Sequence, residues 1–153
     1  MQLKAPAFKP GADIPEQFTC DSASISPALV WTAPPEGTQS FTLIMDDPDA
    51  PGRTWVHWLL YDLPGTEREL PEGVAPKGTL PSDARQGLND FRKTGYGGPC
   101  PPPGPAHRYY FRLYALDTQL HLRAGATRAQ IERSIPGHVL AHAELMGQYR
   151  RKA

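Results

Sequence analysis

The sequence lacks the features that mark membrane-spanning, secreted and nucleic-acid-binding chains. It has no apolar run of the roughly 18 residues that a membrane-spanning helix needs. Residues 1–18 hold no apolar stretch typical of a secretory signal. Sixteen basic and sixteen acidic residues give zero net charge, without the basic excess of nucleic-acid binders. We therefore expect a cytoplasmic protein that neither spans a membrane nor binds nucleic acid.

Cysteine is also scarce, since only Cys20 and Cys100 occur. Two cysteines do not make the disulfide framework of a small secreted scaffold. The simplest interpretation is a pair of reduced thiols. A single bridge and a reactive or ligating thiol are the alternatives, because the distance between the two residues is not encoded in their spacing.

Proline, in contrast, is abundant. The 18 prolines in 153 residues are more than twice the average share of roughly 5%. Proline breaks helix interiors, so a helix bundle or coiled coil is excluded. Apolar residues make up 39% of the chain, enough for one hydrophobic core. The sequence therefore predicts a single, loop-rich and mainly β domain over residues 1–153.

Aromatic and β-branched runs predict the strands, at residues 28–31, 40–45, 54–62 and 107–117. The end of the chain changes character. Thr127 and Gln130 fit a capping box, which predicts a short helix that Pro136 and Gly137 terminate. Apolar residues at helical spacing predict a second helix over residues 138–150. Its exposed apolar side chains favour a homodimer.

Two segments join polar residues to proline-rich loops: DDPDAPGRTWVHW at 46–58 and GYGGPCPPPGPAHRY at 95–109. Strand alternation places Trp55, His57 and Leu59 on one face, with Trp58 on the other. His107 and Tyr109 share a face of their own strand. If the loops cluster, two imidazoles, a phenol and one or two carboxylates form the floor of a pocket. The floor and its walls would comprise Asp47, Asp49, Pro51, Trp55, His57, Pro101, Pro102, His107 and Tyr109.

Carboxylates beside histidines raise the imidazole pKa and fix the tautomer, so that ring N–H groups face the cavity as donors. Such a pocket suits phosphate, a phosphomonoester or a carboxylate. Each histidine has a simpler interpretation as a hydrogen-bonded core residue, and the aspartates as turn formers. His57, His107 and an aspartate would also supply the two imidazoles and one carboxylate of a metal site. No compact metal or cofactor motif occurs, so we expect neither.

Four motifs carry a resemblance to a known family. They are D-P-D-A-P at 47–51, W-x-H-W at 55–58, G-P-x-P-P-x-G at 98–104 and H-R-Y at 107–109. Together they resemble the phosphatidylethanolamine-binding protein (PEBP) family, also called Raf-kinase-inhibitor-like proteins, in its small bacterial and archaeal branch. Further similarity extends over roughly residues 3–150.

The resemblance implies a β-sandwich, with a large antiparallel sheet on a smaller one and short C-terminal helices. It implies an anion pocket for a phospholipid head group or small oxyanion, at Asp47, His57, His107 and Tyr109. The surrounding loops would supply Asp49, Pro51, Trp55, Pro101 and Pro102. The family pattern also implies a cis bond before Pro51.

The resulting hypothesis is a non-enzymatic binding protein that modulates a kinase or protease partner. Two alternatives stay open. One is a hydrolase that uses the Asp/His cluster as acid and base. The other is an interaction module that contacts its partner through the proline-rich loop 99–105.

Overall fold

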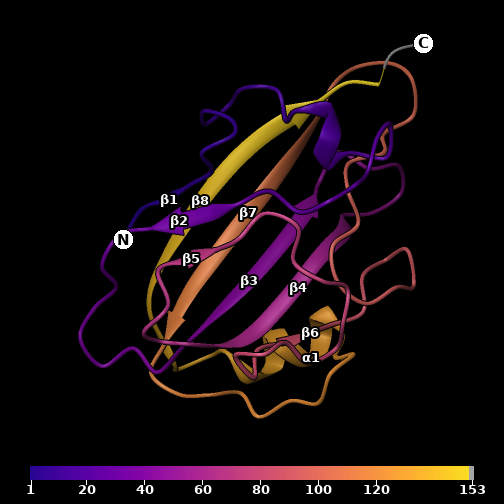
Figure 1. Ribbon diagram of the computed structural model, residues 1–153. Helices are drawn as coiled ribbons and strands as arrows, with labels where there is room; N and C mark the ends of the chain where they lie inside the picture. Colours follow the sequence, from indigo (N-terminus) through magenta and orange to yellow (C-terminus); the bar gives the residue numbers. More distant parts are fainter. Residues whose placement is uncertain (152–153) are drawn as a thin grey trace.

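The computed structural model describes residues 1–151 and consists of two antiparallel sheets with one short α-helix (Figure 1). The large sheet has the strand order β6-β4-β3-β7-β8. Its strands are β3 (Ser40–Asp47), β4 (Trp55–Pro64), β6 (Arg85–Gln86), β7 (His107–Leu116) and β8 (Val139–Tyr149). The small sheet orders β1 (Leu3–Lys4), β2 (Leu29–Trp31) and β5 (Glu69–Leu70). This confirms the predicted mainly β sandwich.

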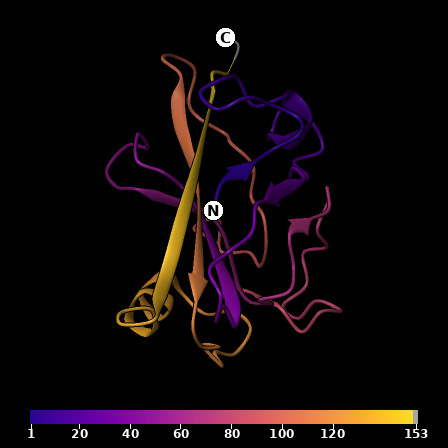
Figure 2. The same ribbon diagram turned by 90° about the vertical axis from the view of Figure 1, so that its left-hand side faces the viewer.

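The main core lies between the two sheets. Seen edge-on, the small sheet and the N-terminal segment cover one face of the large sheet, and α1 (Arg128–Ser134) lies on the other side (Figure 2). Phe41 and Leu43 of β3 and Phe111 of β7 belong to the main core. Ile44 points the other way and packs with Ile131 of α1 in a second cluster. β3 is therefore buried on both faces, as its continuous apolar run predicts.

A β-bulge in β4 changes the predicted alternation. Met45 lies opposite Trp58 while Asp46 lies opposite Val56, so that His57 is the extra residue. His57 and Trp58 consequently both point to the inner side, where Trp58 belongs to the main core. Leu59 belongs to the second cluster, the one that contains Ile44 and Ile131. The predicted shared face of His57 and Leu59 was therefore wrong, because a bulge shifts every later residue to the other face.

The predicted helix after Thr127 is confirmed as α1. The Thr127 side chain accepts a hydrogen bond from the Gln130 amide, and the Gln130 side chain accepts one from the Thr127 amide. These two contacts form the capping box. Among residues 1–151, no helix is long and apolar enough to cross a membrane.

The predicted second helix is wrong, because residues 139–149 form strand β8. β8 pairs with β7 along its whole length, from His107 opposite Tyr149 to Leu116 opposite Val139. Its buried residues recur at every second position, a period that the helical spacing had concealed. The homodimer was expected from apolar side chains exposed on that helix, so the argument for it no longer holds. Val139 and Leu140 are exposed, but they lie at the start of a strand.

The two cysteines are joined by a disulfide, Cys20–Cys100, which links residues 80 positions apart. The interpretation as reduced thiols was therefore wrong. The Cys20 amide donates to the Pro99 carbonyl at 3.0 Å, which holds the two segments side by side. The bridge thus ties the N-terminal segment to the proline-rich loop.

Candidate functional site

A cavity of about 200 Å³ opens where β3 ends and β4 and β7 begin. Antiparallel pairing places the end of β3 beside the starts of β4 and β7, at one end of the large sheet. Eight of the nine predicted site residues line the cavity: Asp47, Pro51, Trp55, His57, Pro101, Pro102, His107 and Tyr109. Ala50, Phe91 and Cys100 complete the lining. The structure therefore brings eight of the nine predicted residues together at one cavity.

Asp47 holds His107 in place. The Nδ1 atom of His107 lies 2.7 Å from Oδ2 of Asp47. The other carboxylate oxygen of Asp47 accepts the Asp49 amide proton at 2.8 Å. Asp47 is buried, and both of its oxygens have partners within the protein. It therefore orients the imidazole, whose Nε2 is the ring nitrogen left for a ligand.

His57 is held by backbone and not by a carboxylate. Its Nδ1 lies 2.6 Å from the Gly97 carbonyl oxygen, and the Gly97 amide donates to the His57 carbonyl at 2.9 Å. Only 3% of His57 is exposed. Burial lowers the pKa of the His57 imidazole below its ordinary value, against the opposing charge of nearby carboxylates. The expectation of a raised imidazole pKa was therefore wrong for His57.

Two donors beside the histidines lack acceptors. The Tyr109 hydroxyl and the Trp55 indole nitrogen are buried without a hydrogen-bond partner in residues 1–151. Burial raises the pKa of Tyr109 far above its ordinary value, and the nearby Asp47 carboxylate adds to this through its charge and as an acceptor beside the hydroxyl, so the phenol keeps its proton. Buried donors nearly always have a partner. These two donors are therefore left for an acceptor from outside residues 1–151.

Phe91 is the site residue that the sequence did not reveal. Its ring centroid lies 5.5 Å from that of Trp55 and 5.3 Å from that of His57, both edge-to-face. It is 37% exposed at the cavity rim. Phe91 follows no strand or helix pattern, and its only signal is an isolated aromatic in a polar loop.

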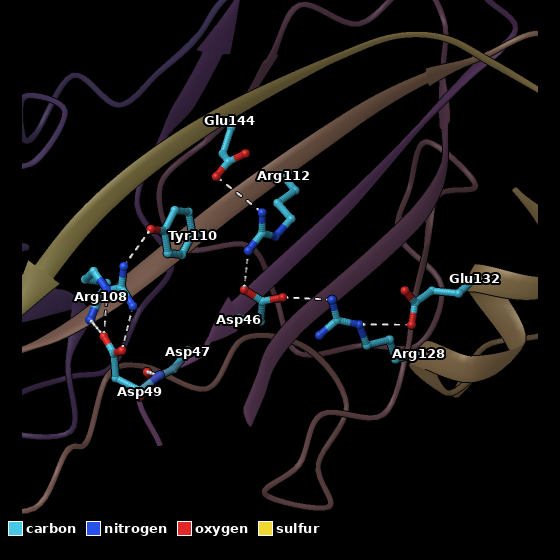
Figure 3. A network of polar contacts seen from close by, with 9 residues as sticks. All are labelled: Asp46, Asp47, Asp49, Arg108, Tyr110, Arg112, Arg128, Glu132 and Glu144. Carbon is cyan, nitrogen blue, oxygen red and sulfur yellow. Dashed lines mark hydrogen bonds and ion pairs between the residues drawn. The ribbon is translucent and has the colours of Figure 1, made fainter. Parts of the chain in front are cut away.

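Asp49 does not line the cavity. Its carboxylate accepts hydrogen bonds from the backbone amide, Nε and Nη2 of Arg108, at 2.8–2.9 Å (Figure 3). The hydrogen bonds from Arg108 hold the pKa of Asp49 at about 2. Asp49 therefore fastens the loop after β3 to the start of β7.

The bond before Pro51 is trans, since residues 1–151 contain no cis peptide. The expected cis bond was therefore wrong. Gly52 adopts a left-handed conformation at φ +83°, and this supplies the reversal of the loop. Pro51 still lines the cavity.

A wider cavity of about 510 Å³ lies between α1 and the loops before β4 and around residue 90. Four of its five charged side chains pair with one another, Arg53 with Asp90 and Arg128 with Glu132, while Arg92 also lines the cavity. Arg128 also contacts the buried Asp46, which in turn contacts Arg112 of β7 (Figure 3). This network joins α1 to the sheet, so its charges have a structural role. No group of three or more potential metal-ligating side chains occurs within residues 1–151.

Comparison with known proteins identifies relatives along the whole chain. The family model for phosphatidylethanolamine-binding protein matches residues 4–150. A UPF0098 protein of Methanothermobacter thermautotrophicus is 48% identical over 151 residues, covering 99% of each chain. The crystal structure of a putative PEBP homologue from Chlamydia trachomatis has a TM-score of 0.90 at 39% identity, covering 99% of this chain and 97% of its own. That of E. coli YbcL has a TM-score of 0.91 at 35% identity, covering 99% and 98%.

Proposed function

Because the chain belongs to the phosphatidylethanolamine-binding protein family, we propose that it is a binding protein whose cavity takes a phosphate- or carboxylate-bearing ligand. The ligand is a free small molecule or the head group of a phospholipid. One observation carries the proposal: the Tyr109 hydroxyl and the Trp55 indole are buried at the cavity without acceptors. An oxyanion supplies acceptors for both.

The size of the cavity supports a small ligand group. At about 200 Å³ it is smaller than the roughly 300–1,000 Å³ of sites that enclose drug-sized ligands. A phosphate or carboxylate fits inside, and any attached chain extends past the rim at Phe91 and Pro102.

The lining residues favour binding over turnover. The sulfur of Cys100 is committed to the disulfide and is not a nucleophile. No serine, threonine or lysine lines this cavity. We therefore propose a protein without enzymatic activity, against the alternative of a hydrolase in which His57 and His107 activate water. The proposal extends to modulation of a kinase or protease partner, and that part rests on the family alone.

An anion titration followed by histidine NMR tests the proposal. Inorganic phosphate or acetate should shift the ring signals of His57 and His107 and leave those of His138 and His142 unchanged. Substitution of His107 by alanine should weaken phosphate binding. If no anion moves either pocket histidine, the binding proposal fails. Hydrolysis of a phosphomonoester that His107→Ala abolishes would establish the hydrolase instead.

A further inference from the structure

The two pocket histidines both use Nδ1 for contacts within the protein. In His57 the contact is to the Gly97 carbonyl oxygen, at 2.6 Å. A carbonyl oxygen can only accept, so Nδ1 of His57 carries the proton. In a neutral ring Nε2 then has a lone pair and no proton. His57 consequently offers the cavity an acceptor, contrary to the donor that the sequence suggested.

The surroundings of His57 keep the ring neutral. Phe91 and Tyr109 pack edge-to-face against it, with centroids at 5.3 and 5.2 Å. Burial dominates and lowers the pKa of His57, although three carboxylates oppose it. The titratable and charged groups around the ring are Asp46, Asp47, Asp90, Tyr109 and His107. Asp46 and Asp90 are themselves paired with arginines.

The unprotonated Nε2 of His57 favours anions that carry a proton over anions that do not. A fully deprotonated oxyanion would place an oxygen lone pair against Nε2 of His57, which is unfavourable. A hydrogen phosphate or a protonated phosphomonoester instead donates its O–H to Nε2. The remaining oxygens accept from the Tyr109 hydroxyl and the Trp55 indole, the two donors without partners.

We propose that the cavity selects oxyanions that carry a proton, with His57 Nε2 accepting it, and that hydrogen phosphate and singly protonated phosphomonoesters are its ligand class. This inference rests on the proposed function of the cavity and narrows it. Sulfate, phosphodiesters and the dianion of a phosphomonoester, whose second pKa is about 6, have no proton to donate, so they bind only when His57 takes up a proton from solvent. The intact head group of a phospholipid is such a diester.

If the cavity selects proton-bearing anions, the affinities for phosphate and for sulfate should depend differently on pH. Between about pH 7.5 and 8.5 inorganic phosphate is mainly the hydrogen phosphate dianion, which brings its own proton. Its affinity should be nearly constant over this range. Sulfate must bind together with one proton, so its affinity should fall about tenfold per pH unit. Phosphate should also bind at least about tenfold more tightly than sulfate, because a buried mispaired acceptor is costly.

Isothermal titration calorimetry with phosphate and sulfate across this pH range tests the inference. Phosphoethanolamine and glycerophosphoethanolamine then distinguish a free monoester from the head group of a lipid. At about pH 6, near its second pKa, the monoester should bind more tightly by at least the same factor. Above about pH 7, where it has lost that proton, its affinity should fall with pH as that of sulfate does. Equal affinities and equal pH slopes for the two inorganic anions would overturn the inference and leave the proposed anion pocket intact. No binding by any of the four would refute the anion pocket itself.

A variant identifies the residue responsible. Glutamine at position 57 can present either its amide oxygen or its amide nitrogen, so His57→Gln should abolish the preference for phosphate over sulfate. His142→Gln, at an exposed histidine on β8, should leave the preference unchanged. If the His57 variant does not fold, 15N NMR of the unliganded protein decides. An unprotonated Nε2 in His57 at neutral pH supports the inference, and a protonated Nε2 overturns it.

Discussion

Tyr109 illustrates how a single residue links core packing to the proposed binding site. Its ring is fully buried and its hydroxyl has no partner within residues 1–151. A buried hydroxyl that lacks its hydrogen bond costs roughly 1–3 kcal/mol. The protein therefore carries an unfavourable group, whose cost the proposed ligand would remove.

Replacement of Tyr109 by phenylalanine should separate these two effects. Tyr109→Phe should raise the free energy of unfolding by about 1 kcal/mol and weaken phosphate binding about tenfold. Tyr96→Phe is the matched control, because the Tyr96 hydroxyl donates to the Phe18 carbonyl at 2.8 Å. That variant should lose about 1 kcal/mol of stability and retain binding. Chemical denaturation and phosphate titration measure both, and a Tyr109 variant less stable than the wild type would contradict the prediction.

His57 should make stability depend on pH. Its pKa is lower in the folded protein than in the unfolded chain, where it is about 6.5. Below about pH 6.5 the unfolded chain therefore binds more protons, and the free energy of unfolding falls as the pH decreases toward the folded pKa. His57→Gln should remove this part of the slope. Denaturant unfolding at about pH 7.5 and 5.5 tests it against His142→Gln, and an unchanged slope in the His57 variant would count against a neutral buried ring.

At the level of secondary structure, the sequence was most informative where pattern and burial agree. β3, β4 and β7 were predicted because their residues are apolar, β-branched and aromatic over long runs. Since their ends carry Asp47, His57 and His107, the floor of the site followed from the same pattern. The short strands β5 and β6 span two residues each and have no period that a sequence can display.

Other features depended on contacts that a local pattern does not contain. The apolar residues of β8 satisfy both a helical and a strand period, and only pairing with β7 decides between them. The bulge at His57 arises from register with β3. Phe91 reaches the cavity because the Asn89 side chain shapes its loop. The Asn89 side-chain oxygen accepts a hydrogen bond from the Phe91 amide at 2.9 Å.

Close packing over β8 should make Gly147 intolerant of substitution. A Cβ at this position would lie 2.6 Å from Cγ1 of Ile14 and 2.8 Å from Cε2 of Phe8. Gly147→Ala should therefore lower the free energy of unfolding by about 1–3 kcal/mol, because it overpacks the contact with the N-terminal segment. His142→Ala, on the exposed side of the same strand, should change it by less than about 0.5 kcal/mol. Equal stabilities of the two variants would refute this account of the contact.

At the scale of the whole molecule, the disulfide joins distant parts of the chain to the site. Cys100 lines the cavity between Pro99 and the two wall prolines, and its partner lies near the N-terminus. Disulfides persist mainly in oxidising compartments and in hyperthermophiles. The N-terminal sequence led us to expect a cytoplasmic protein, whereas the Cys20–Cys100 disulfide is a feature more frequent in oxidising compartments.

Removal of the bridge should affect stability and binding together. The double variant Cys20→Ser/Cys100→Ser should lose about 2–4 kcal/mol of unfolding free energy, because the unfolded chain regains the freedom of a long loop. Phosphate affinity should also decrease, since the wall of Pro101 and Pro102 is no longer tied down. Denaturant unfolding and calorimetry measure the two effects, with wild-type protein before and after reduction as the internal comparison. Stability equal to that of the oxidised protein would exclude a bridge in solution.

The hydrogen bonding of the tryptophans gives the protein an intrinsic optical reporter. Of its three tryptophans, Trp31 donates its indole proton to the Glu67 carbonyl and Trp58 donates to the Gln86 side chain. Only Trp55 has an unpartnered indole N–H, and only Trp55 lines the cavity. Occupation of the site should therefore change the fluorescence of one indole while the other two remain constant. Unlabelled protein can thus be screened for its natural ligand by emission alone.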